Sequence, residues 1–184
     1  KGISSAARAE DWCTYELNHY ILGHLAWNPD VNVDSLINGF CHARYGTAWK
    51  TAQTAYASLE NIVRVYSSIP FTTLKPKEQI VQAETKIEEQ IQALQKTKQA
   101  SDDTIASANL SRFLLMFQYV RINLQIQEAR ADNASKEILE KKIEDLLAFL
   151  KANEDKGVFL LSGKNDWILF MKHYGLTNQS LLDL

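Results

Sequence analysis

The side chains best suited to acid–base chemistry lie near the start of the chain. Glu10, Asp11 and Glu16 fall within one predicted helix, and a pair of carboxylates is the usual equipment of a glycosidase. Such a pair must face one pocket about 5 to 10 Å apart, with the pKa of one member raised. Carboxylates on a helix surface usually stay solvated instead. We therefore expect no catalytic residue here.

Metal binding and nucleophilic catalysis also lack their motifs. His19 and His24 are five positions apart, which does not match the i, i+4 spacing of a zinc-binding HExxH helix. Cys13 and Cys41 have no CxxC pair and no cluster at zinc spacing. No GxSxG elbow, P-loop or GxGxxG motif occurs. The sequence predicts no catalytic, metal-binding or cofactor-binding residue.

Charge and hydropathy exclude two further classes of partner. The 20 Lys and Arg residues nearly balance the 22 Asp and Glu residues, giving a formal charge of −2. This balance supplies no electrostatic reason to expect nucleic acid. No apolar run approaches the roughly 20 residues of a membrane-spanning helix. The chain starts at Lys1 without a visible signal peptide, which favours a cut from a longer protein.

Glycine and proline divide the chain into predicted helices. Prolines occur only at positions 29, 70 and 76, and neither Pro nor Gly occurs from Lys77 to Lys156, which is typical of long helices. We expect helices at about 5–27, from a cap at Asn32 or Asp34 to 45, at 48–68, from 76, from a cap within 101–103, from a cap at Asn133 or Ser135 to 157, and at 165–174. The prediction is an all-α fold, a bundle of about six to seven helices with the three long helices running up-down-up.

The distribution of apolar residues predicts how these helices pack. The segment from Leu110 to Ile126 is apolar almost all round, so it should be the central helix. The first helix has two apolar faces, which predicts burial on both sides. Six aromatic residues of the first three predicted helices are expected to pack helices more often than to stack on sugars: Trp12, Tyr15, Tyr20, Trp27, Tyr45 and Trp49. We predict a single helical domain over 1–184, with a hinge at 70–76 between subdomains 1–69 and 77–184.

One compact pattern in the first quarter of the chain resembles a known family. The pattern comprises Leu17-Asn18, Tyr20, Leu25, Trp27-Asn28-Pro29-Asp30, Val33-Asp34, Leu36, Phe40 and Tyr45-Gly46. It is similar to the segment that follows the catalytic barrel in bacterial glycoside hydrolases of family 163, the N-glycan endo-β-N-acetylglucosaminidases, and in related proteins. Similar helical tails follow barrels of the family 20 and family 89 kind. The match covers under a fifth of the chain.

The resemblance implies a domain that supports a carbohydrate-active module. Catalytic residues would lie upstream, so none is carried over to this chain, and we expect no activity from this segment alone. The partner would be the upstream catalytic domain of the same polypeptide, with a glycan as a further candidate. A bacterial, extracytoplasmic location, in the periplasm or at the cell surface, is also implied. The expected interdomain or sugar-stacking surface comprises Trp12, Tyr15, His19 and Trp27.

Two alternatives remain open from the sequence. One is a stand-alone helical protein–protein interaction module, which requires a self-contained first helix and a partner surface elsewhere. The other is a small carbohydrate-binding or hydrolysing domain, which requires a deep pocket where a carboxylate and exposed aromatics converge. The non-catalytic domain implied by the resemblance instead predicts an exposed apolar or aromatic patch on the N-terminal helix.

Overall fold

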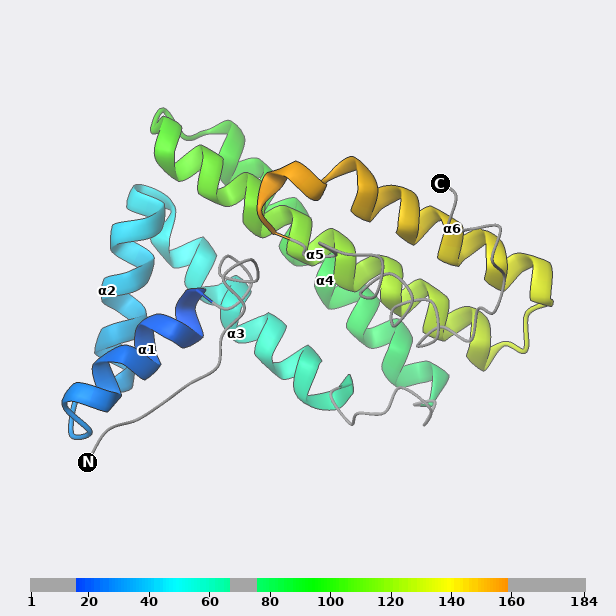
Figure 1. Ribbon diagram of the computed structural model, residues 1–184, viewed down its shortest axis with the longest axis horizontal. Coiled ribbons are helices and arrows are strands. Elements are labelled where there is room, and N and C mark those ends of the chain that lie inside the picture. Colours follow the sequence, from blue (N-terminus) through cyan, green and yellow to red (C-terminus); the bar gives the residue numbers. More distant parts are fainter. Residues whose placement is uncertain (1–15, 67–75, 159–184) are drawn as a thin grey trace.

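The computed structural model describes residues 16–66 and 76–158, and all regular elements within those ranges are helical (Figure 1). They are α1 (Glu16–Trp27), α2 (Val33–Tyr45), α3 (Trp49–Tyr66), α4 (Lys77–Gln99), α5 (Thr104–Ala131) and α6 (Lys136–Ala152), with short 3-10 turns η2 (Gly46–Ala48) and η3 (Glu154–Lys156). The predicted all-α class is confirmed for this part of the chain. The predicted helix at 165–174, the start of the first helix and residues 70–75 of the predicted hinge lie outside the described residues.

Side-chain caps decide where three of these helices begin. The Asn32 side chain accepts a hydrogen bond from the backbone N–H of Ser35 at 2.8 Å, so α2 is capped by Asn32 and not by the alternative Asp34. Asp103 caps α5 and Ser135 caps α6 in the same way. Each cap satisfies backbone N–H groups that have no partner within the helix. Local sequence alone therefore explains these boundaries.

A glycine ends α2 and lets the start of α5 approach closely. Gly46 has a φ of +52°, a conformation that residues with a Cβ rarely adopt. A Cβ at this position would lie 3.2 Å from Oδ2 of Asp103, the cap of α5. The Asn109 side chain also donates to the carbonyl oxygen of Arg44 at 2.8 Å. These contacts join the first turns of α5 to the last turn of α2.

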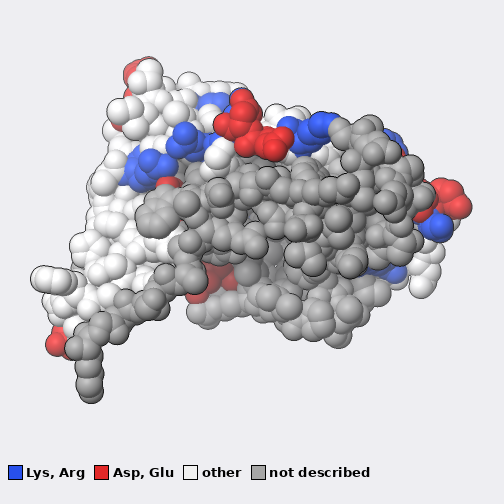
Figure 2. Space-filling view, in the orientation of Figure 1, with Lys and Arg blue, Asp and Glu red and all other residues white. Residues whose placement is uncertain are grey.

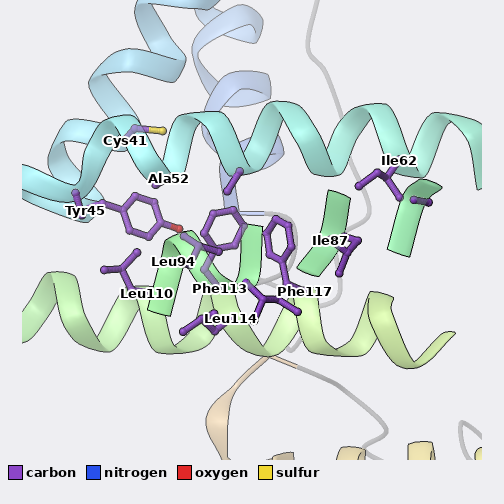
Figure 3. Packing of buried hydrophobic residues seen from close by; sticks show 14 of the residues in the cluster. Cys41, Tyr45, Ala52, Ile62, Ile87, Leu94, Leu110, Phe113, Leu114 and Phe117 are labelled. Atoms are coloured by element: carbon purple, nitrogen blue, oxygen red, sulfur yellow. The ribbon is translucent and has the colours of Figure 1, made fainter. Parts of the chain in front are cut away.

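The hydrophobic core surrounds α5. It takes side chains from α2, α3, α4 and α5, and its most buried members include Tyr45, Ile87 and Leu94. Figure 3 shows Phe113 and Phe117 of α5 pointing toward α3, and the ring centroids of the two phenylalanines are 5.2 Å apart. The predicted role of this segment as the central helix is confirmed. The core contains residues from both sides of positions 67–75, while the division into subdomains stays a prediction.

The second half of the described chain is a layer of three long helices. Figure 1 shows α4 and α6 lying along α5, and the connections at 100–103 and 132–135 are short. A smaller apolar cluster of Ile126, Ile143, Leu146 and Leu150 joins α5 to α6. The total number of helices in the chain and the up-down-up order stay predictions. None of the helices in the described ranges has the length and apolar character needed to span a membrane.

Candidate functional site

The start of α1 is fastened to the end of α2 by a two-point ion pair. Nη2 of Arg44 lies 2.8 Å from Oε2 of Glu16, and Nε of Arg44 donates to Oε1 of Glu16 at 3.3 Å. The side chain of Glu16 is only 13% exposed and that of Arg44 is 30% exposed. Planar, two-point pairing of this kind fixes orientation as well as distance. It therefore sets how α1 crosses α2.

Two phenols extend this polar cluster into the core. The hydroxyl oxygens of Tyr45 and Tyr56 lie 3.0 Å apart, and the Tyr56 hydroxyl also interacts with Glu16. Burial raises the pKa of both tyrosines far above the usual value, so both stay neutral. They supply hydrogen bonds and no charge. We call Glu16, Arg44, Tyr45 and Tyr56 the α1 anchor.

The α1 anchor contains one carboxylate and not the pair that glycosidic chemistry needs. Burial raises the pKa of Glu16, and the neighbouring Arg44 and Arg112 guanidinium groups oppose that rise. The described groups acting on Glu16 are basic or phenolic, and none is a second carboxylate. Glu10 and Asp11, the other members of the candidate pair, lie outside the described residues. The geometry here supports attachment of a helix.

The histidines and the cysteine within the described residues do not assemble into a metal site. His24 is exposed, with its ring centroid 4.5 Å from that of Tyr20, and His19 is half-buried. Cys41 is a free thiol with no exposed surface, and burial raises its pKa to about 11. Among residues 16–66 and 76–158, no group of three His, Cys, Asp or Glu side chains is placed to hold a metal ion.

Beyond the anchor, α1 is far more exposed than its sequence indicated. None of its twelve residues is fully buried; Leu17 and Tyr20 are packed against the core only in part. Leu22 is 41% exposed and Trp27 is 93% exposed. The expectation that α1 is buried on both faces is wrong for the described structure, because α2 is its main packing partner and covers one side. The opposite side faces outward.

The four residues of the predicted surface have different outcomes. Trp12 and Tyr15 lie outside the described residues. His19 is half-buried on α1, while Trp27 projects from the last turn of the helix. The general preference for core packing holds for Tyr45, which is buried, and fails for Trp27. His42 is exposed and stacks on Trp49 with a centroid separation of 4.0 Å.

The exposed surface of α1 and α2 is almost free of charge. From Leu17 to Ala43 the only charged residues are Asp30 and Asp34, whereas 23% of the whole chain is charged. Figure 2 shows the result as a broad uncharged area on the side of the molecule where α1 and α2 lie. We call the exposed residues of segment 17–43 the α1–α2 face. Trp27 and Leu22 are its most prominent apolar side chains.

Comparison with known proteins adds no family assignment. No family model matches the chain, and searches of curated proteins and of solved structures find no relative.

Proposed function

We propose that this chain is a non-catalytic helical domain, C-terminal in a secreted bacterial glycoside-hydrolase-like protein, which packs its α1–α2 face against an upstream catalytic barrel. In this proposal the complete domain is a bundle of six to seven helices whose three long members run up-down-up. The protein acts on glycans in the periplasm or at the cell surface, and the helical domain supports the barrel.

The uncharged α1–α2 face is the observation that carries this proposal. Interface cores are depleted in charged residues and enriched in aromatic ones, and Trp is frequent among residues that dominate binding energy. Trp27, at 93% exposure, has an indole that gains by being covered. The position of this face also agrees with the family 163 resemblance, because it is formed by the segment that would follow the barrel.

The way α1 is attached supports the same reading. The α1 anchor holds the first turn of the helix, and Tyr20 packs on Phe40 with ring centroids 5.4 Å apart. The second half of α1, from Gly23 to Trp27, has no such ties to the described part of the chain and is exposed except for Leu25, which is partly covered. A helix that is oriented at one end and exposed at the other is suited to contact a neighbouring domain.

The test compares this chain with the intact parent protein. We expect the isolated chain to leave chitobiose-type and N-glycan substrates uncleaved while the parent cleaves them. Hydrolysis by the isolated chain would overturn the proposal. Trp27→Ser in the parent should separate thermal unfolding into two transitions, because the interdomain contact is weakened. Ile138→Ser is the matched control, since Ile138 is exposed (51%) on α6, away from the α1–α2 face.

A second candidate function is sugar binding by the exposed indole. Trp27 is followed by Asn28 and Asp30, whose side chains offer polar atoms beside an aromatic ring, the combination found in sugar sites. Titration with N-glycan oligosaccharides while indole fluorescence is recorded separates the two functions. A saturable change abolished by Trp27→Ser favours sugar binding. No change in the isolated chain, together with a shielded Trp27 in the parent, favours interdomain packing.

The third reading, a stand-alone interaction module, has less support. It requires a first helix that is covered within the chain, whereas the described part of α1 leaves Leu22 and Trp27 exposed.

A further inference from the structure

Three polar contacts join α4 to α5 in one antiparallel register. Lys77 Nζ donates to both carboxylate oxygens of Asp132, at 2.6 and 2.7 Å. Glu88 pairs with Arg121, with Nη1 of the arginine 3.1 Å from Oε2. Residue numbers fall along α5 as they rise along α4, so the contacts follow one another along two antiparallel helices. Both of these contacts join opposite charges.

The contact between these two ion pairs joins two acids. Glu84 of α4 lies between Lys77 and Glu88 along the helix, and the Glu128 carboxylate of α5 acts on it through like charge and a side-chain hydrogen bond. One oxygen of Glu84, Oε1, is buried and has no hydrogen-bond partner. Two ionised carboxylates in contact repel each other, and a single shared proton turns the repulsion into a hydrogen bond. Among these three contacts, the one between Glu84 and Glu128 therefore needs a proton to become attractive.

The third long helix supplies a matching charge. Lys142 of α6 attracts the Glu84 carboxylate. Glu128, which repels it, is the other charged side chain that acts on Glu84 among the described residues. With both acids ionised, the group of three side chains carries one net negative charge. With one proton bound, Lys142 balances the remaining carboxylate. The half-buried setting of Glu84 favours the balanced state.

We propose that the Glu84–Glu128 pair is a proton-binding position that tightens the packing of α4 on α5 in mildly acidic conditions. Burial and the adjacent Glu128 carboxylate both raise the pKa of Glu84, whereas Lys142 lowers it. An acid whose pKa is higher in the folded state contributes stability that is complete below its unfolded pKa. That contribution is lost as pH rises through the folded value. The neighbouring ion pairs, Lys77–Asp132 and Glu88–Arg121, need no such proton.

Glu84→Gln tests this position, because the amide donates a hydrogen bond to Glu128 without taking up a proton. We expect the variant to be more stable than wild type near pH 8 and to lose the added stability that wild type gains toward pH 5.5. One proton changes the unfolding equilibrium constant by up to about tenfold per pH unit. Glu89→Gln, an exposed position on the same helix, is the control and should keep the wild-type profile.

Two further measurements keep the proposal open to refutation. Lys142→Met should move the pH-dependent transition upward, because the lysine no longer favours the ionised acids. Carboxyl NMR titration of wild type, assigned with Glu84→Gln, should show that Glu84 binds its proton at a higher pH than a glutamate ordinarily does. Identical pH profiles for Glu84→Gln and Glu89→Gln, or an ordinary titration of Glu84, would overturn the proposal.

Discussion

Arg44 holds Glu16 from a position 28 residues further along the chain, with two nitrogen–oxygen contacts of 2.8 and 3.3 Å. This pair decides where α1 lies, because the remaining described contacts of that helix with the core are partial. The backbone of Arg44 is itself tied to α5 through Asn109. A surface helix is thereby connected to the central helix through one arginine.

Replacing this arginine should loosen α1 in a pH-dependent way. In Arg44→Met, the half-buried Glu16 carboxylate loses its partner, and we expect a cost of about 1.5–3 kcal/mol at pH 8. The cost should shrink toward pH 4.5. There Glu16 becomes protonated, because its pKa is raised by burial and rises further without Arg44. Hydrogen exchange of the α1 amides measures the effect. Arg112→Met, which removes a charge that acts on Glu16 less strongly than Arg44 does, should have the smaller consequence.

Two glycine substitutions should have opposite effects on stability. Gly46→Ala places a Cβ at a φ of +52° and 3.2 Å from Asp103, so we expect a loss of about 1–2 kcal/mol. Gly23→Ala lies within α1 with no atom within 4 Å of the added Cβ, and should gain roughly 0.5–1 kcal/mol of helix propensity. Urea unfolding of the two variants gives the comparison. A stabilised Gly46→Ala would contradict the account of the α2 stop.

Two aromatic truncations should separate the core from the exposed face. Phe117 has no exposed surface and packs edge-on against Phe113. Phe117→Ala should therefore cost about 3–5 kcal/mol, through lost burial and the cavity left behind. Trp27→Ala in the isolated chain should change the unfolding free energy by less than about 0.5 kcal/mol, because the indole is 93% exposed. Equal losses in the two variants would show that Trp27 is covered.

Helix type and most helix ends could be predicted from the sequence because they depend on nearby residues. A cap such as Asp103 acts within three positions, and an unbroken run without Pro or Gly favours one long helix. The central position of α5 was predictable for a related reason, since a helix that is apolar all round must be surrounded.

The candidate site was less predictable because it depends on contacts between distant parts of the chain. Nothing around Glu16 indicates that Arg44 will face it, and nothing around Glu84 indicates Glu128. For Trp27 the residue pattern favoured helix packing, whereas the family resemblance placed it on a surface, and its indole is 93% exposed. Residue type gives only an average tendency toward burial, whereas the exposure of one indole depends on which neighbours are present. The sparse charge of segment 17–43 was the sequence signal that indicated this surface most directly.

The enclosed sulfhydryl of Cys41 gives this protein an internal reporter of core opening. Its sulfur is shielded from reagents, and with a pKa of about 11 it is almost entirely un-ionised near neutral pH. Alkylation in a Cys13→Ser background therefore requires the helices around it to separate transiently. The labelling rate then reports how readily the core opens around this one position in any variant, without denaturant.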